Sequence, residues 1–243
     1  MKALILAGGR GKRLNEHTRN KNKCMMEING RHAIEHSLDY ASRNGIGEIV
    51  IIVGYRAEEI INRFGNSYDG KKITYVIQWD QKGLVHAIEC AKTALDGHDF
   101  LLLLGDEVFT EPRHGEMIEA YKDEGAFALC GMIRVEDRSL ISKTYSALYE
   151  DDGTIHRLVE KPSNPLNDMM GTGSSVLNNG IFDYIDVTPV HHLRKEKELP
   201  DLIQCTIDDG KNVKLFEVSK EYVNINVRED LSQAERILND EAE

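Results

Sequence analysis

Glycines and cations gather near the start of the chain, in a segment whose chemistry suits phosphate. Gly8, Gly9 and Gly11 follow the apolar run 3–7. Glycine tolerates positive φ and leaves backbone N–H groups open, so a glycine turn after a strand forms an anion-binding concavity. Between positions 10 and 23 the chain has one acid, Glu16, and six bases: Arg10, Lys12, Arg13, Arg19, Lys21 and Lys23. Because the whole chain has a net charge of −11, this local positive charge predicts a phosphate-rich ligand.

Spacing separates three kinds of phosphate-binding turn. A Walker A loop needs Ser or Thr after Gly-Lys, but Arg13 follows Gly11-Lys12. A dinucleotide-binding turn has a third glycine where this chain has Leu14. What remains is Leu-Ala-Gly-Gly-x-Gly-x-Arg-Leu over residues 6–14, with Lys23 downstream. This pattern resembles the signature of the sugar-1-phosphate nucleotidyltransferases.

The resemblance implies a reaction in which a sugar-1-phosphate oxygen attacks the α-phosphorus of a nucleoside triphosphate and pyrophosphate leaves. Two anions must meet, so such a site needs cations and a metal ion more than a proton-transfer pair. The family implies Mg²⁺ as cofactor, a nucleoside triphosphate and a sugar-1-phosphate as substrates, and a homo-oligomer. It assigns Arg13 to the β- and γ-phosphates and Lys23 to the α-phosphate. The nucleotide-binding residues implied at this turn are Leu6, Ala7, Gly8, Gly9, Gly11, Lys12 and Arg13.

A predicted metal site combines residues from two distant segments. Gly105-Asp106 follows the apolar run 100–104, so Asp106 projects from a strand end, and its hard carboxylate suits Mg²⁺. The family places its metal-binding aspartate in this context. Its second ligand is usually an aspartate on a late strand, and here Asn224 has that position, with Asn226 next on the same strand face. An amide oxygen lacks the charge of a carboxylate, so we expect weaker metal affinity, and the choice between the two asparagines stays open.

Base recognition is predicted for Gln78 and Gly83. The segment 75–87 resembles the Gln…Gly-Leu-Ala stretch of the family's thymidylyltransferases. A side-chain amide can pair with the O4/N3–H edge of thymine or uracil, and glycine lets a base lie against the backbone. These residues therefore favour dTTP or UTP over purine nucleotides.

The sugar phosphate is predicted to bind further along the chain. Glu160-Lys161-Pro162 resembles the Glu-Lys-Pro motif on the sugar side of the family site. The resemblance implies that Glu160 accepts hydrogen bonds from sugar hydroxyls and that Lys161 binds the sugar phosphate as a point charge. Ser146 has the position of a sugar-contacting glycine, and Gly173 is expected to line the same pocket. The catalytic residues implied are Arg13, Lys23, Asp106 and Lys161.

Alternating strands and helices must position these residues. We expect strands at 2–7, 48–54, 72–78 and 99–104, and helices at 32–44, 57–64 and 84–95. The pattern predicts an α/β fold with a doubly wound, mostly parallel sheet. The family fold is Rossmann-like. In the second half we expect strands at 126–135, 174–178 and 214–218, a hairpin at 145–149 and 154–160 that forms a small sugar-side β subregion, and helices at 199–208 and 228–239.

The chain reads as one domain over residues 1–243, with a nucleotide-binding half at 1–110 and a sugar-phosphate-binding half at 111–243. Ligands of such sheets bind at the carboxyl ends of strands, near a topological switch point. The glycine turn, Gln78 and Asp106 all follow expected strands. We therefore expect these residues to face one cleft.

Composition excludes several classes of protein. The four cysteines lie far apart, without metal-ligand spacing, and are expected to be reduced thiols. An acidic chain is unsuited to nucleic acid. The apolar run 3–7 is too short for a signal-peptide core, and no window is long enough to span a bilayer. We expect a cytoplasmic protein without membrane or nucleic-acid partners.

Two alternative functions remain open. One is a CTP-dependent cytidylyltransferase that acts on an alcohol phosphate or phosphonate, such as phosphocholine. Gln78 and Glu160-Lys161-Pro162 speak against it. The other is a catalytically silent regulator that binds nucleotide sugars. Asn224 keeps that hypothesis open, whereas Asp106 and Lys161 speak against it.

Overall fold

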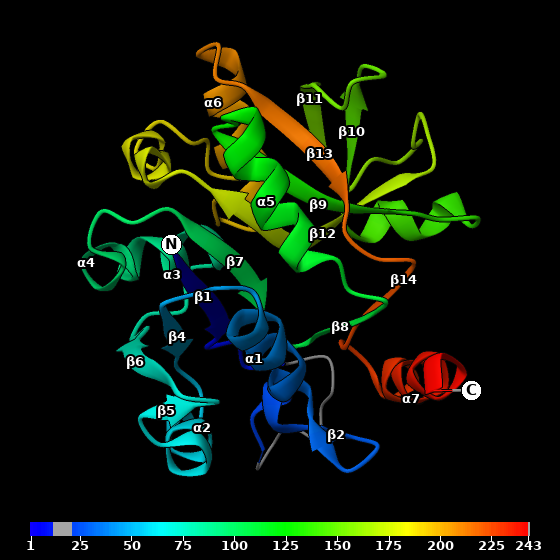
Figure 1. Ribbon diagram of the computed structural model, residues 1–243. Coiled ribbons are helices and arrows are strands. Elements are labelled where there is room, and N and C mark those ends of the chain that lie inside the picture. Colours follow the sequence, from blue (N-terminus) through cyan, green and yellow to red (C-terminus); the bar gives the residue numbers. More distant parts are fainter. Residues whose placement is uncertain (12–20, 243) are drawn as a thin grey trace.

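A large mixed sheet organises the fold (Figure 1). The computed structural model describes residues 1–11 and 21–242, and these residues include one eight-stranded sheet. Its strands, in spatial order, are β13 (Val213–Glu217), β9 (Ala128–Arg134), β12 (Met169–Leu177), β7 (Phe100–Leu104), β1 (Lys2–Ala7), β4 (Glu48–Val53), β6 (Lys71–Ile77) and β5 (Ser67–Tyr68).

Strand order places a topological switch point beside β1. β1 pairs in parallel with β4 and with β7, and β4 pairs in parallel with β6. β9 and β13 are also parallel, whereas β12 runs antiparallel to its neighbours β7 and β9. The chain runs outward from β1 through β4 to β6 and then returns to the other side of β1 as β7. The carboxyl ends of β1 and β7 therefore meet where a doubly wound sheet binds its ligand.

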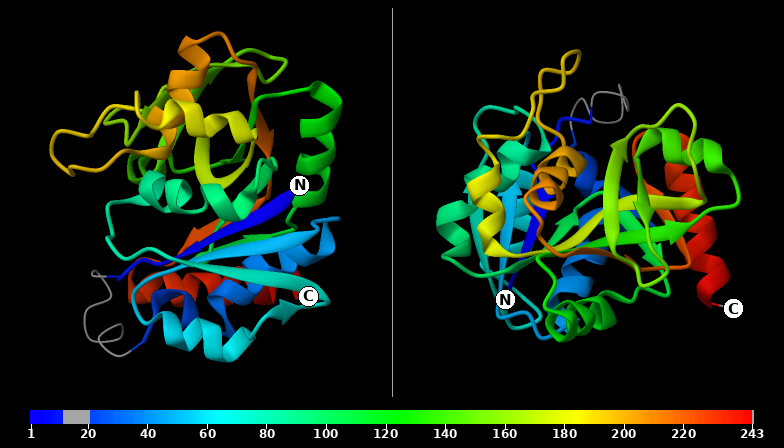
Figure 2. Two further views of the ribbon diagram at one scale, coloured as in Figure 1. Left: turned by 90° about the vertical axis from the view of Figure 1, so that its left-hand side faces the viewer. Right: turned by 90° about the horizontal axis from the view of Figure 1, so that it is seen from above.

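Helices cover both faces of the sheet (Figures 1 and 2). Ala3, Ile5 and Ala7 of β1 point to one core, and Leu4 points to the other, because successive strand residues face opposite sides. The first core contains α1 (Ala33–Arg43), α2 (Ala57–Phe64) and α5 (His114–Glu124). The second contains α3 (Leu84–Cys90), α4 (Lys92–Leu95), α6 (Leu199–Asp208) and the 3-10 helix η4 (Asn179–Tyr184). Burial on both faces explains why the central strands are continuous apolar runs.

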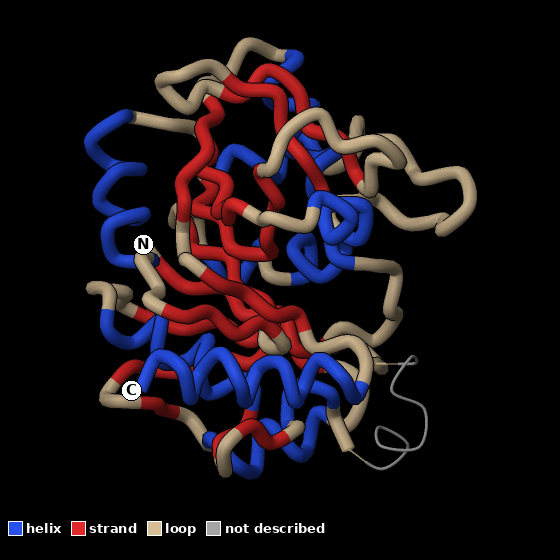
Figure 3. Tube along the Cα trace, turned by 90° about the vertical axis from the view of Figure 1, so that its right-hand side faces the viewer, coloured by secondary structure: helices blue, strands red, loops and turns tan. Residues whose placement is uncertain are grey.

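A third, smaller core joins the end of the chain to the site. β8 (Glu107–Thr110) pairs antiparallel with β14 (Glu221–Asn224), and Asn224 lies opposite Glu107. Val108 and Val223 from this ribbon pack with Ala234 and Ile237 of α7 (Arg228–Ala242). Figure 3 shows these strands and helices as a tube along the chain. The pairing brings the turn after β7 beside residues 224–226.

The predicted fold class is confirmed, and most elements begin and end near their predicted limits. α2 and α6 have the predicted bounds, and β10 (Tyr145–Tyr149) and β11 (Ile155–Glu160) form the predicted hairpin. The predicted helix 84–95 is instead two helices, α3 and α4, on either side of Ala91. β12 is longer than the predicted strand 174–178, since it begins at Met169.

The remaining elements are short. They are the 3-10 helices η2 (Lys23–Met25) and η3 (Arg138–Lys143) and the two-stranded ribbon of β2 (Glu27–Ile28) and β3 (Arg31–His32). In the described part of the chain, no helix is long and apolar enough to cross a membrane.

Candidate active site

A cavity of about 460 Å³ opens at the switch point. It is lined by predicted residues from five separate segments: Leu6, Gly8, Gly9, Gly11, Lys23, Gln78, Gly83, Asp106 and Asn226. The cavity therefore unites residues predicted for the triphosphate, the base and the metal. Ala7 is buried at the end of β1, and Lys12 and Arg13 lie outside the described residues.

The start of the glycine turn is fixed by its neighbours. The carbonyl oxygen of Gly8 accepts hydrogen bonds from the Tyr55 backbone N–H at 3.1 Å and from Gln81 Nε2 at 2.8 Å. A Cβ atom at Gly8 would lie 3.1 Å from Gln78 Oε1, tighter than ordinary contact. A side chain at this position would therefore displace the predicted base-binding amide, which explains the glycine without invoking its φ.

Asn22 positions Lys23, and sequence reasoning missed it. The Asn22 side chain accepts from the Cys24 backbone N–H at 2.8 Å and thereby caps η2. Its Nδ2 donates to the carbonyl oxygens of Ala7 at 3.2 Å and Tyr55 at 2.7 Å. These bonds tie the start of η2 to the last residue of β1 and to the chain that follows β4. Asn is a common capping residue, so an Asn directly before Lys23-Cys24 was a sequence signal for a helix start at this point.

The predicted metal-binding residues Asp106 and Asn226 meet at one cationic group. Lys23 Nζ forms an ion pair with Asp106 Oδ2 and donates to Asn226 Oδ1 at 3.4 Å. A carboxylate and an amide oxygen that already face a single positive charge fit a hard cation such as Mg²⁺, which takes few protein ligands. Among the described residues, no group of three or more His, Cys, Asp or Glu side chains offers another metal site.

Asn224 lies behind Asn226 rather than in the cavity lining. Asn226 Nδ2 donates to Asn224 Oδ1 at 2.8 Å and to its carbonyl oxygen at 3.2 Å. These contacts occupy the donor end of the Asn226 amide, so its oxygen faces Lys23. The geometry thus favours Asn226 as the ligand and Asn224 as the residue that orients it.

Glu107 is a second carboxyl group beside Asp106, and sequence reasoning missed it. Glu107 Oε1 accepts hydrogen bonds from Tyr222 Oη at 2.7 Å, from the Gly173 backbone N–H at 2.9 Å and from Asn224 Nδ2 at 3.5 Å. Burial, followed by the charge of Asp106, raises the pKa of Glu107 to about 8. This side chain joins β12 and β14 to the turn that carries Asp106.

Glu160 and Lys161 form a second cluster with Arg194. Glu160 Oε1 lies 2.8 Å from Lys161 Nζ and 3.3 Å from Arg194 Nη2. Burial raises the pKa of Glu160, and Lys161 partly offsets that shift. Arg194, which sequence reasoning missed, also pairs with Glu198 next to α6. Glu196 lines the cavity two residues further on, so this loop joins the cluster to the cavity.

Ser146 and Gly173 are held in protein packing. Ser146 is buried, and its Oγ donates to Asn167 Oδ1 at 3.2 Å. Gly173 lies within β12, and its N–H donates to Glu107. Neither residue is among those that line the described cavity. Their predicted contact with the sugar stays a prediction.

The packing around Gly173 predicts a loss of stability on substitution. A methyl group there would overlap the Leu104 side chain and lie 2.8 Å from Glu107 Oε1. We expect Gly173→Ala to lower the free energy of unfolding by about 1–3 kcal/mol, measured by urea denaturation. Gly47→Ala is the control, since its nearest atom would be the Met1 carbonyl oxygen at 3.9 Å. Equal denaturation midpoints for the two variants would contradict this packing argument.

The fold is a doubly wound α/β fold, and its cavity brings together the residues predicted for phosphate, base and metal at the switch point. A model of the Nucleotidyl transferase family matches residues 2–225, and the chain belongs to this family.

Similar proteins of known sequence come from archaea and bacteria. UTP–glucose-1-phosphate uridylyltransferase AglF of Haloferax volcanii is 30% identical over 241 residues, which cover 99% of this chain and 98% of that protein. Glucose-1-phosphate thymidylyltransferase of Streptomyces griseus is 29% identical over 241 residues, covering 98% of this chain and 66% of that protein. The bifunctional protein GlmU of Methanococcus maripaludis is 33% identical over 214 residues, covering 87% and 48%.

Solved structures share the fold. A UDP-glucose pyrophosphorylase complexed with UDP-glucose superimposes with a TM-score of 0.89 at 20% identity, over 98% of both chains. A putative glucose-1-phosphate thymidylyltransferase from Bacillus anthracis superimposes with a TM-score of 0.88 at 23% identity, over 99% of this chain and 96% of that one.

Proposed function

We propose that the protein transfers a nucleotidyl group from UTP or dTTP to a sugar-1-phosphate, with Mg²⁺ as cofactor, and releases pyrophosphate. The observation that carries this proposal is the meeting of Lys23, Asp106 and Asn226 in the cavity that also holds the glycine turn. Membership of the Nucleotidyl transferase family supports the reaction class. The names of the relatives, one a uridylyltransferase that uses UTP and one a thymidylyltransferase, support the two pyrimidine nucleotides.

The chemistry is an in-line displacement that fixed positive charge accelerates. A sugar-phosphate oxygen forms a bond to the α-phosphorus while the bond to the bridging β-oxygen breaks, and the electron pair leaves with pyrophosphate. Lys23 neutralises the α-phosphate, and the glycine turn holds the triphosphate. Arg13 keeps its predicted place at the β- and γ-phosphates, and Lys12 stays a predicted nucleotide-binding residue. Mg²⁺ held by Asp106 and Asn226 would supply further charge stabilisation and orient the phosphates.

The sugar phosphate is assigned to the cluster of Glu160, Lys161 and Arg194. Lys161 and Arg194 can bind a phosphate, while Glu160 accepts hydrogen bonds from sugar hydroxyls. This assignment keeps residues 1–110 as the nucleotide-binding half and 111–243 as the sugar-phosphate-binding half. Asn226 and Glu196 are exceptions, since they reach the nucleotide cavity from the second half.

Cellular context follows from the substrates. We assign the enzyme to the cytoplasm, where nucleoside triphosphates are available, and all four cysteines are free thiols in the structure, as expected there. A homo-oligomer remains the expectation drawn from the family resemblance.

A pyrophosphate-release assay tests the function. The common nucleoside triphosphates are combined with a panel of sugar-1-phosphates in the presence of Mg²⁺. We expect turnover with UTP or dTTP and a hexose-1-phosphate. Turnover only with CTP and an alcohol phosphate would support the cytidylyltransferase alternative. Nucleotide-sugar binding without turnover of any pair would support the silent regulator.

The roles of Asn224 and Asn226 in metal binding can be distinguished by replacing each of them with aspartate. We expect Asn226→Asp to lower the Mg²⁺ dissociation constant roughly tenfold, because ligand charge sets affinity for hard cations. Asn224→Asp should have a smaller effect, since that side chain contacts Asn226 rather than the cavity. Isothermal titration with Mg²⁺ in the absence of substrates measures both constants. A larger gain in Asn224→Asp would reverse the assignment of ligand and orienting residue.

A further inference from the structure

The Gln78 side-chain amide has a fixed orientation. Gln78 follows β6, is buried and lines the cavity. Its Nε2 lies 3.1 Å from the carbonyl oxygen of Gly83 and 3.0 Å from His86 Nδ1. A carbonyl oxygen can only accept a hydrogen bond, so the atom facing Gly83 must be the amide nitrogen. Turning the amide over would place two carbonyl oxygens against each other.

The tautomer of His86 follows from that orientation. Because Gln78 Nε2 is a donor, His86 Nδ1 must be the acceptor, and the imidazole is neutral with its hydrogen on Nε2. His86 Nε2 faces Cys90 Sγ at 3.9 Å, one turn further along α3. Both hydrogens of the Gln78 amide nitrogen are therefore used within the protein, one by Gly83 and one by His86.

Only the oxygen of the Gln78 amide is left for a ligand. Gln78 Oε1 has no hydrogen-bond partner among the described residues and lies against Gly8 at the cavity wall. Uracil and thymine have an N–H at ring position 3, whereas the same atom of cytosine is an acceptor. In a base seated with ring position 3 against Gln78 Oε1, this acceptor pairs with N3–H of uracil or thymine and is repelled by N3 of cytosine.

We propose that His86 is a specificity-determining positioning residue: by accepting the second hydrogen of Gln78 Nε2, it reinforces the orientation that the Gly83 carbonyl oxygen favours, in which Gln78 presents an acceptor, and so strengthens selection of uridine or thymidine nucleotides over cytidine nucleotides. The inference rests on the proposed function, whose base-binding residue is Gln78, and names a residue that stabilises the polarity of that contact. Without His86, one Gln78 hydrogen in a buried site is unpaired, and only the Gly83 carbonyl oxygen opposes turning of the amide.

The test compares UTP and CTP in a set of residue-86 variants. His86→Leu removes the acceptor, and His86→Lys replaces it with a donor, so either variant tests the inference if the other fails to fold. His86→Gln keeps an acceptor in its amide oxygen. His156→Leu is the control, because His156 pairs with the exposed Glu150 on the β10–β11 hairpin. Dissociation constants are measured by calorimetry, and kcat/KM by pyrophosphate release.

We expect the UTP-to-CTP preference to fall roughly tenfold in His86→Leu, the size of one buried hydrogen bond lost, and further in His86→Lys. His86→Gln and His156→Leu should keep the wild-type preference. An unchanged preference in a folded variant without the acceptor would overturn the inference, as would an equal fall in His86→Gln. A wild-type protein that binds neither UTP nor dTTP would instead contradict the proposed function itself.

Discussion

Asp106→Ala is expected to lower kcat by roughly 10²–10³-fold, the cost of removing one group that stabilises developing charge in a preorganised site. The Asp106 side chain is buried at the end of β7 and pairs with Lys23. Removing its carboxylate leaves Asn226 as the remaining assigned metal ligand. It also frees Lys23 from the partner that holds its ammonium group at the cavity.

The loss of activity should occur without loss of the fold. Asp106 raises the pKa of the neighbouring Glu107, so the two carboxylates repel each other in the folded state. Alanine at position 106 removes that repulsion, and the pKa of Glu107 should fall towards its ordinary value. The free energy of unfolding of Asp106→Ala should therefore stay close to that of the wild type.

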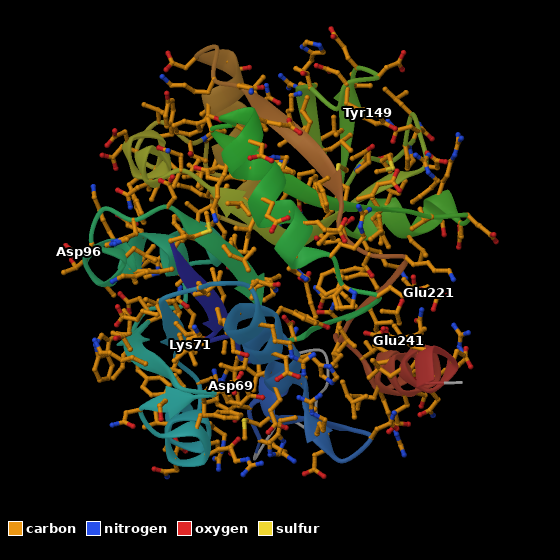
Figure 4. All side chains as sticks on the ribbon, in the orientation of Figure 1. Asp69, Lys71, Asp96, Tyr149, Glu221 and Glu241 are labelled. Carbon is orange, nitrogen blue, oxygen red and sulfur yellow. The ribbon has the colours of Figure 1, made fainter. Side chains whose placement is uncertain are left out.

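The measurement is pyrophosphate release at saturating substrates, paired with urea denaturation. Asp240→Ala is the matched control, since Asp240 also pairs with a basic residue, Arg236 at 3.5 Å, but is exposed on α7. Glu241 marks that end of α7 in Figure 4. The control should keep wild-type turnover. If Asp106→Ala keeps more than about a tenth of the wild-type kcat, Asp106 is not a catalytic residue.

Local sequence patterns were sufficient to predict most strands of the sheet and the residues of one wall of the site. Residues 49–53 and 100–104 are continuous apolar runs of a length typical of strands buried on both faces. Because Gly8 and Gly105 each directly follow a strand, and parallel strands share one carboxyl edge, the sequence predicts that the glycine turn and Asp106 converge. The structure places both at the same cavity.

The remainder depends on contacts between distant segments that carry no local signal. β8 and β14 are each four residues long and have no strong periodicity, so the family resemblance, and no local pattern, predicted that Asn226 lies near Asp106. Arg194 lies in an irregular loop, and its role depends on where β11 ends. His86 is one polar residue on α3, and its importance emerges only from its contact with Gln78.

Lys161 offers a test that separates the two substrates. Its ammonium group lies beside Glu160 and near Arg194, and none of these three residues is among those lining the described cavity. Lys161→Met keeps the aliphatic stem and removes the charge. We expect kcat/KM for the sugar-1-phosphate to fall by roughly 10²-fold, as for loss of one charge-stabilising contact. The dissociation constant of UTP should stay within about twofold of wild type, because the substitution changes none of the residues proposed to bind the nucleotide.

Lys72→Met is the matched control, because Lys72 also pairs with a glutamate, Glu48 at 2.9 Å, but at the amino ends of β4 and β6, opposite the carboxyl ends that face the cavity. Its kinetics should match the wild type. The Lys161→Arg variant tests the geometry of the contact. Arginine keeps the charge but replaces a compact ammonium group with a planar guanidinium group, so we expect kcat/KM for the sugar-1-phosphate to lie between those of Lys161→Met and the wild type. Equal weakening of UTP and sugar-phosphate binding in Lys161→Met would contradict a division of labour between the two clusters. If kcat/KM for the sugar-1-phosphate falls and the dissociation constant of UTP does not change, binding of the sugar phosphate is assigned to Lys161, because the substitution alters no other charge.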